Sequence, residues 1–158
     1  MLRYQWGRLN KQQVGAYCEY FVKMELTMHG FQVYTTEVDD RGIDFVCRHG
    51  AGPFLQVQVK SARALQNVFM FKSKFELADN LYLALGLLLS DGDLPQLYFI
   101  PSTAWRTPDT LFCGNDYGEG LKSKPEWRLN LSLRNMKALE TYRFESTIDR
   151  LVLNGWTT

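Results

Sequence analysis

The sequence has little histidine, few cysteines and no long apolar run. Its 158 residues include two histidines and three cysteines, Cys18, Cys47 and Cys113, which are far apart and show no CxxC spacing. This pattern disfavours a structural zinc site and predicts free thiols in a reducing compartment. The N-terminal residues lack an apolar signal region, and the most apolar run, 81–89, has about half the length needed to cross a bilayer. We therefore expect a cytoplasmic, intracellular protein with no membrane partner.

An excess of charge of one sign is also absent. The chain carries 18 basic and 17 acidic residues, for a formal net charge of +1. This near-neutrality is weak evidence against nucleic-acid binding by bulk electrostatics alone, but metal-binding carboxylates would cancel basic residues elsewhere. The length predicts a single domain spanning residues 1–158.

Hydrophobic periodicity and turn residues predict an α/β chain. Residues 10–29 are expected to form a helix, with Asn10 as its N-cap and Gly30 as its end. Short Gly-containing turns then separate three extended segments, which predicts an antiparallel meander. The expected strands are 31–37, 43–48, 54–60, 68–72, 81–89, 96–100 and 127–131, the later helices are 132–140 and 146–153, and 106–127 is expected to be a long loop. Segment 81–89 fits a strand covered on both faces, although periodicity alone also permits a buried helix.

Two neighbouring strands of this meander carry polar residues that suit phosphodiester hydrolysis. Alternation along 54–60 puts Gln58 and Lys60 on one face, about 6–7 Å apart at their Cα atoms. If strands 43–48 and 54–60 pair as a hairpin, a register exists that sets Asp44 beside both residues. The carboxylate and amide oxygens suit Mg²⁺, and the lysine can orient water or neutralise charge that develops on a phosphate. The alternative is that Gln56, Gln58 and Lys60 form the solvated face of an amphipathic strand.

The first predicted helix offers a further carboxylate. Glu19 lies on a helical stripe with Gly15, Val22 and Leu26, where an ionised group needs a partner or a metal ion. Glu25 is in similar apolar surroundings and competes for the same role. Each is also compatible with a partly exposed charge at the edge of the helix.

The ordered set of these motifs resembles the core of PD-(D/E)xK nucleases. The motifs are Gly15-x3-Glu19-x2-Val22-x3-Leu26-x3-Gly30, then Gly42-Ile43-Asp44-Phe45-Val46, then Gln56-Val57-Gln58-Val59-Lys60-Ser61. The resemblance covers roughly residues 10–61 and is closest in style to small Holliday-junction-resolvase-like and restriction-like members. It implies a mixed central sheet flanked by helices, a restriction-endonuclease-like core.

The resemblance also implies residue roles. It gives Glu19, Asp44, Gln58 and Lys60 as catalytic residues and Asp44, Gln58, Val59 and Glu19 as metal ligands, with Mg²⁺ as cofactor and Mn²⁺ as a substitute. Gln58 stands where most members carry Asp or Glu, which removes one negative charge and predicts weaker metal binding or reliance on a single ion. Ser61, Arg63, Lys72, Lys74, Lys122 and Lys124 are candidate DNA-binding residues, although each also fits plain surface charge.

The expected function is a Mg²⁺-dependent DNA endonuclease active in restriction, homing or branched-DNA processing. Because one small domain carries one site, cutting both strands favours a homodimer or homotetramer. The alternative is a catalytically impaired nuclease-fold module that binds nucleic acid or a protein partner, which the glutamine and the neutral charge favour. A structural or toxin–antitoxin partner protein has no positive feature in the sequence.

Overall fold

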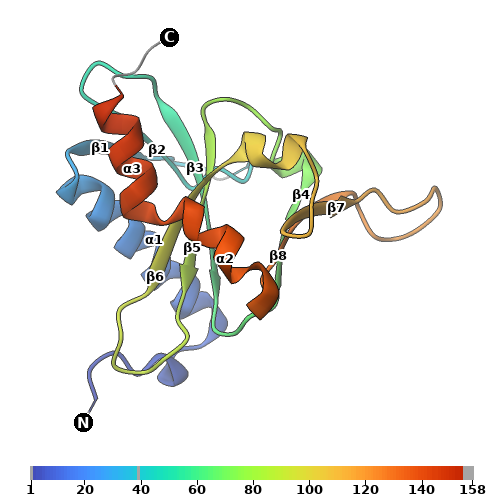
Figure 1. Ribbon diagram of the computed structural model, residues 1–158, viewed down its shortest axis with the longest axis horizontal. Coiled ribbons are helices and arrows are strands. Elements are labelled where there is room, and N and C mark those ends of the chain that lie inside the picture. Colours follow the sequence, from blue (N-terminus) through green and yellow to red (C-terminus); the bar gives the residue numbers. More distant parts are fainter. Residues whose placement is uncertain (1, 39, 155–158) are drawn as a thin grey trace.

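The chain folds into two β-sheets, with α-helices packed on one face of the larger sheet (Figure 1). The computed structural model describes residues 2–38 and 40–154. In chain order the described elements are η1 (Trp6–Arg8), α1 (Lys11–Met28), β1 (Phe31–Thr35), β2 (Phe45–His49), β3 (Leu55–Ala62), β4 (Asn67–Phe71), η2 (Lys72–Lys74), β5 (Leu81–Leu87), β6 (Gln96–Pro101), η3 (Ser102–Arg106), β7 (Phe112–Asn115), β8 (Glu126–Asn130), η4 (Leu133–Asn135), α2 (Met136–Leu139), η5 (Glu140–Tyr142) and α3 (Phe144–Leu153), where η denotes a 3₁₀ helix.

The larger sheet is mixed. Its strand order is β1-β2-β3-β5-β6. The first three strands form the antiparallel meander that the turns predict, β3 and β5 run parallel, and β5 and β6 run antiparallel. The predicted fold class, a mixed central sheet flanked by helices, is therefore confirmed.

One face of this sheet is covered by α1 and α3, whose apolar residues share a core with β2, β3, β5 and β6. A capping box starts α1, with Asn10 and Gln13 each accepting a hydrogen bond of 2.9 Å from the other's backbone N–H. The helix approaches the sheet closely at Gly86, where a β-carbon would collide with the Sγ atom of Cys18. Glycine at this position of β5 is therefore required by packing.

The opposite face is covered by a second sheet of three antiparallel strands in the order β4-β8-β7. A second apolar core, which includes Met70, Leu129 and Trp105, joins this sheet to β5 and β6. All seven residues of β5 are buried because the strand has a core on each side. The strand interpretation of the apolar run is confirmed over the helix, and the strand ends at Leu87.

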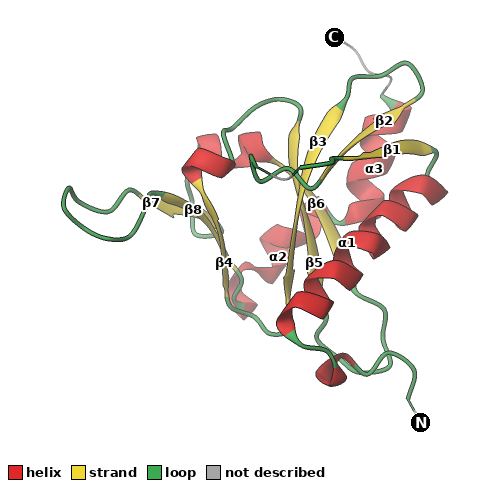
Figure 2. Cartoon of the chain, turned by 180° about the vertical axis from the view of Figure 1, so that it is seen from behind, coloured by secondary structure: helices red, strands yellow, loops and turns green. Residues whose placement is uncertain are grey.

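One sequence prediction of local structure is wrong and another is confirmed only in part. The predicted loop 106–127 contains β7, which pairs with β8, and the β7–β8 hairpin projects from the body of the molecule (Figure 2). The predicted helix 132–140 is confirmed in part, because residues 133–142 are helical but only α2 is α-helical, between the 3₁₀ turns η4 and η5. At the start of this stretch, the Nδ2 of Asn135 donates to the carbonyls of Thr110 and Asn130 at 2.9 and 3.0 Å, which ties two other segments to it.

The cysteines are free thiols, as the sequence predicts. Cys18 and Cys47 are buried free thiols, burial raises the pKa of each to about 12, and Cys113 is a half-buried free thiol. Within residues 2–38 and 40–154, no helix combines the length and apolarity needed to span a bilayer.

Candidate active site

Asp44 lies where β2 begins to pair with β3. Its backbone N–H donates to the Val57 carbonyl at 2.9 Å, and one of its carboxylate oxygens, Oδ2, accepts from the Val59 N–H at 2.6 Å. Asp44 directly precedes the first residue pair of the two strands, Phe45 with Val57. The two strands therefore pair antiparallel, as expected, and the bond to Val59 holds the carboxylate beside the middle of β3.

Gln58 is a buried polar residue with an unpaired acceptor. Its side chain is 9% exposed, and its amide oxygen, Oε1, has no hydrogen-bond partner among the described residues. The interpretation of this strand face as solvated is therefore wrong for Gln58, because the second sheet covers it. A buried acceptor without a partner destabilises a fold by about 1–3 kcal/mol, so this oxygen requires an explanation.

The segment before β2 closes over Gln58 because Gly42 allows a close approach. Gly42 has a φ of +79°, and a β-carbon there would lie 2.9 Å from the carbonyl oxygen of Lys74 and 3.5 Å from Nε2 of Gln58. A larger residue would suffer both backbone strain and collision. The glycine of the Gly42-Ile43-Asp44 motif thus has a structural role that the sequence left unassigned.

Lys60 is half-buried on the same face of β3 as Gln58. Burial lowers the pKa of its ammonium group, the nearby Asp44 carboxylate opposes that shift, and Lys11 adds to it. Lys60 lines two hollows at once. One, of about 280 Å³, also contains Gly42, Gln58 and Lys74. The other, of about 520 Å³, lies between the start of α1 and residues 59–66.

These groups fit a small divalent cation with oxygen ligands. The Asp44 carboxylate binds the N–H of Val59, the residue that follows Gln58 with its unpaired Oε1. The N–H and C=O of one strand residue point to the same side, so the Val59 carbonyl faces the Asp44 side of β3 together with the N–H that binds Oδ2. Carboxylate, amide and backbone oxygens are the ligand types that Mg²⁺ accepts alongside retained water.

The donor set differs from a polycarboxylate cluster. Among the residues that the structure describes, no three His, Cys, Asp or Glu side chains are grouped so that they could hold a metal ion. A cation at Asp44 would depend on one carboxylate and neutral oxygens. The sequence expectation of weaker metal binding, which followed from the glutamine, stays a prediction.

The two candidate helix glutamates lie in different places. Glu19 forms an ion pair of 2.9 Å with Lys23, whose Nζ lies 5.5 Å from the centroid of the Phe45 ring, next to Asp44 in the chain. Glu25 instead lines a hollow with residues of β6 and with Arg143. Glu19 is therefore on the stretch of α1 that faces the start of β2, and Glu25 belongs to the α3 side of the molecule.

The predicted DNA-binding residues separate into three groups. Ser61 and Arg63 line the 520 Å³ hollow beside Lys60, and the Arg63 guanidinium donates to the Leu9 carbonyl. Lys72 is engaged elsewhere, since its Nζ lies 2.7 Å from an Asp116 carboxylate oxygen and 3.9 Å from the centroid of the Trp127 ring. Lys74 lines the 280 Å³ hollow with Gln58, and Lys122 and Lys124 line a neighbouring hollow.

Sequence reasoning missed three side chains around this site: Phe69, Phe71 and Tyr117. The two phenylalanines line the hollow that contains Gln58 and Lys60, and all three line the hollow that contains Lys122 and Lys124. A signal was present, because residues 68–71 read Val-Phe-Met-Phe and are apolar on both faces of the strand. On a strand with only one buried face, this pattern leaves two aromatic rings exposed.

Comparison with known proteins identifies the fold. No family model matches the sequence, and no curated protein matches it. Among solved structures, the Holliday junction resolvase Hjc from the archaeal hyperthermophile Archaeoglobus fulgidus superposes with a TM-score of 0.56 at 15% identity, over 87% of this chain and 97% of that one. A bacterial homing endonuclease superposes with a TM-score of 0.47 at 18% identity, over 78% of this chain and 77% of that one. The chain thus has the restriction-endonuclease-like fold, a five-stranded mixed sheet flanked by helices, that Hjc has.

Proposed function

We propose that this protein is a metal-dependent DNA endonuclease that hydrolyses phosphodiester bonds, with Mg²⁺ as cofactor and Mn²⁺ as a substitute. The observation that carries the proposal is the buried, unpartnered Oε1 of Gln58, a residue that lines one hollow with Lys60 and precedes Val59, whose N–H binds the Asp44 carboxylate. Stability alone does not favour such a group, whereas a cation ligand must present an oxygen of this kind. The fold shared with a Holliday junction resolvase supports the same conclusion.

Each residue of the site has a distinct role in this proposal. Asp44, Gln58 and the Val59 carbonyl hold the cation, and the Val59 N–H fixes the Asp44 carboxylate through its 2.6 Å hydrogen bond. A bound divalent cation would polarise the phosphate and lower the pKa of a water ligand. Lys60 stabilises negative charge that develops on the phosphate, and its half-buried position makes that interaction stronger than it would be in water. Glu19 contributes a second carboxylate from α1.

Cutting both strands of a duplex requires two such sites. The chain is proposed to form one nuclease domain with one site, so a symmetric homodimer or homotetramer would present a site to each strand. Light scattering on the purified protein tests this assembly, and a monomer at micromolar concentration would contradict it.

A catalytically impaired nuclease-fold module that binds nucleic acid or a protein partner is the second candidate. It is favoured by the amide at position 58 and by the absence of a three-member acidic or His/Cys group in the described chain. Titration calorimetry with Mg²⁺ and Mn²⁺ separates the two candidates, since a module that has lost its site would not bind either ion.

The main test is cleavage of supercoiled plasmid with Mg²⁺ or Mn²⁺. Asp44→Asn and Lys60→Met should each lower the nicking rate by about 100-fold or more, because each removes a charge that acts on the phosphate or its cation. The asparagine side chain would retain an oxygen acceptor for the Val59 N–H, so circular dichroism should show an intact fold.

Glu25→Gln is the matched control for Glu19→Gln. We expect the Glu19 variant to cut slowly and the Glu25 variant to cut at the native rate. No metal-dependent cutting of plasmid, branched or single-stranded DNA by the native protein would overturn the proposal in favour of the binding module.

A further inference from the structure

Two phenylalanines are exposed beside the candidate active site. Phe69 and Phe71 of β4 are 46% and 40% exposed, and their ring centroids lie 5.5 Å apart in an edge-to-face arrangement. Alternation along the strand puts both rings on the outer face of the three-stranded sheet, while Val68 and Met70 are buried beneath it. We refer to Phe69 and Phe71 as the aromatic pair.

The aromatic pair forms the wall between two hollows. One hollow, of about 280 Å³, contains Gln58, Lys60 and Lys74. The other, of about 310 Å³, lies against the β7–β8 hairpin and contains Lys122 and Lys124. A ligand lying on the two rings would therefore extend directly to the groups that we propose to act on a phosphate.

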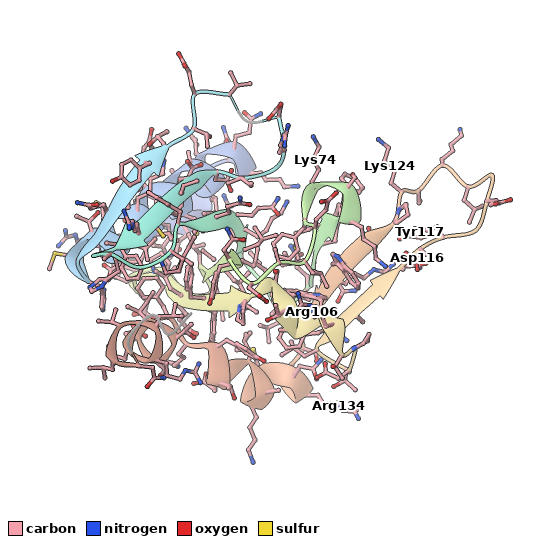
Figure 3. The ribbon with its side chains drawn as sticks, turned by 90° about the horizontal axis from the view of Figure 1, so that it is seen from above. Lys74, Arg106, Asp116, Tyr117, Lys124 and Arg134 are labelled. Atoms are coloured by element: carbon pink, nitrogen blue, oxygen red, sulfur yellow. The ribbon has the colours of Figure 1, made fainter. Side chains whose placement is uncertain are left out.

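The surroundings of the aromatic pair are basic. The Nζ atom of Lys124 lies 6.0 Å from the centroid of the Phe71 ring, and Lys74 and Lys124 both project toward the top of the view in Figure 3. No described acidic side chain forms an ion pair with Lys74, Lys122 or Lys124.

The acidic group in these two hollows, Glu126, is already engaged. It accepts from Arg128 Nε at 2.6 Å and from the Tyr117 hydroxyl at 2.9 Å. The remaining charges that line the hollows are positive and complement a chain of phosphates.

Exposed aromatic rings among lysines are the surface chemistry of single-stranded nucleic-acid binding. A nucleobase stacks on an aromatic ring while flanking cations hold its phosphates. A base inside a duplex cannot use such rings, because both of its faces are covered by its neighbours. An apolar protein partner would gain from the rings but not from three surrounding lysines.

We propose that the aromatic pair stacks an unpaired DNA nucleotide next to the cleavage site, so that the substrate class is DNA with a single-stranded segment rather than plain duplex. The inference rests on the proposed function, since it places the stacked nucleotide relative to Asp44, Gln58 and Lys60. Lys74, Lys122 and Lys124 hold the phosphates on either side of that nucleotide.

The test is DNA binding in EDTA, where no cleavage occurs. Fluorescence anisotropy would compare a short labelled oligonucleotide, its blunt duplex, and the same duplex with a single-stranded flap. The native protein should bind the single strand and the flap at least about fivefold more tightly than the blunt duplex. The Phe69→Leu/Phe71→Leu variant should lose about tenfold in affinity for the single strand and less than about twofold for the duplex, since leucine keeps the apolar surface but cannot stack as a ring.

Phe54→Leu is the matched control. Phe54 is 48% exposed and contacts Arg48 and Tyr34 rather than the site, so its substitution should leave both affinities unchanged. Phe69→Trp/Phe71→Trp should restore or exceed the native preference for the single strand.

Two results would overturn the proposal. One is equal affinity of the native protein for single strand and duplex, or an unchanged preference in the leucine variant. The other is a native homodimer that Phe69→Lys/Phe71→Lys converts to a monomer by light scattering, which would assign the surface to a second copy of the chain. Binding is measured without cleavage, so this test is independent of the nuclease assay. If the native protein cuts plasmid but the leucine variant keeps the native binding preference, the stacking proposal is wrong and the proposed nuclease activity still stands.

Discussion

Strands β3 and β4 follow one another in the chain, and both depart from the rule that polar residues are exposed and apolar residues are buried. On β3 the amide of Gln58 is 9% exposed, and on β4 the ring of Phe69 is 46% exposed. A sequence optimised for stability alone would place a polar residue outside and an aromatic residue inside. The two reversals line the same hollow, together with Lys60 and Lys74.

The two strands differ in their position in the sheets, and this position decides how firmly Gln58 and the two phenylalanines are held. β3 is central in the five-stranded sheet and pairs with β2 and β5, so its side chains are fixed by cores on both faces. β4 is at the edge of the three-stranded sheet, with a core on one face only. The first strand suits a site of fixed geometry, and the second suits a surface that a flexible ligand covers.

The largest expected effect compares the two faces of β4. Met70→Ala should lower the free energy of unfolding by about 2–5 kcal/mol, because the side chain is 1% exposed and its removal leaves a cavity. Phe71→Ala, one residue away on the outer face, should change the free energy by less than about 1 kcal/mol. Urea denaturation followed by circular dichroism measures both. Similar losses would mean that the Phe71 ring packs into the core and is not a free surface.

A smaller effect concerns the unpaired amide of Gln58. Gln58→Leu should raise the free energy of unfolding by about 1 kcal/mol, since it removes a buried acceptor that has no partner. The same change should abolish binding of Mg²⁺ and Mn²⁺ in titration calorimetry.

Gln58→Glu is its matched control. Without metal it should destabilise the protein, because a buried carboxylate beside Asp44 is unfavourable. Added Mn²⁺ should restore the lost stability. If Gln58→Leu destabilises the fold instead, the Oε1 atom has a partner in solution and is not held for a cation.

The smallest effect concerns the pH dependence of Lys60. Burial lowers its pKa, so at neutral pH the charged ammonium group is less stable in the folded state than in the unfolded chain, where water solvates it. As the pH rises toward the ordinary value of 10.5, the folded protein loses the proton before the unfolded chain, and the penalty disappears. Lys60→Met should therefore be more stable than the native protein at neutral pH, and the gap should narrow in alkaline solution.

Urea denaturation of the native protein and Lys60→Met at neutral and at alkaline pH tests this stability difference. Lys137→Met is the control, because Lys137 of α2 is exposed. A gap that widens with pH would show that the interaction with Asp44 outweighs burial at Lys60.

Much of the five-stranded sheet could be predicted from the sequence. The turn residues around Gly42 and Gly50 indicated the antiparallel pairing, and the seven apolar residues of β5 indicated a strand covered on both faces. The hairpin pairing also brings Asp44 to β3, where its carboxylate binds the Val59 N–H. These features depend on neighbours that are close in sequence.

The second sheet could not be predicted in the same way. β7 lies in a stretch rich in Gly, Asp and Asn with low strand propensity, and it forms because β8 and the core around Trp105 and Phe112 supply its partners. The 3₁₀ turns that flank α2 were also not predicted. Asn135, at the start of this stretch, donates hydrogen bonds to the carbonyls of Thr110 and Asn130, which belong to other segments of the chain.

The sequence by itself determined the helix–meander order, the alternation along β3 and therefore the set Asp44, Gln58 and Lys60. Those features follow from the backbone periods and from short turns, which act over a few residues. Only the tertiary structure decided that the Gln58 oxygen is buried without a partner among the described residues, that Glu19 and Glu25 face different parts of the molecule, and that Phe69 and Phe71 stand beside the site. Burial and proximity of this kind depend on how the two sheets pack, and packing joins residues that are far apart in the chain.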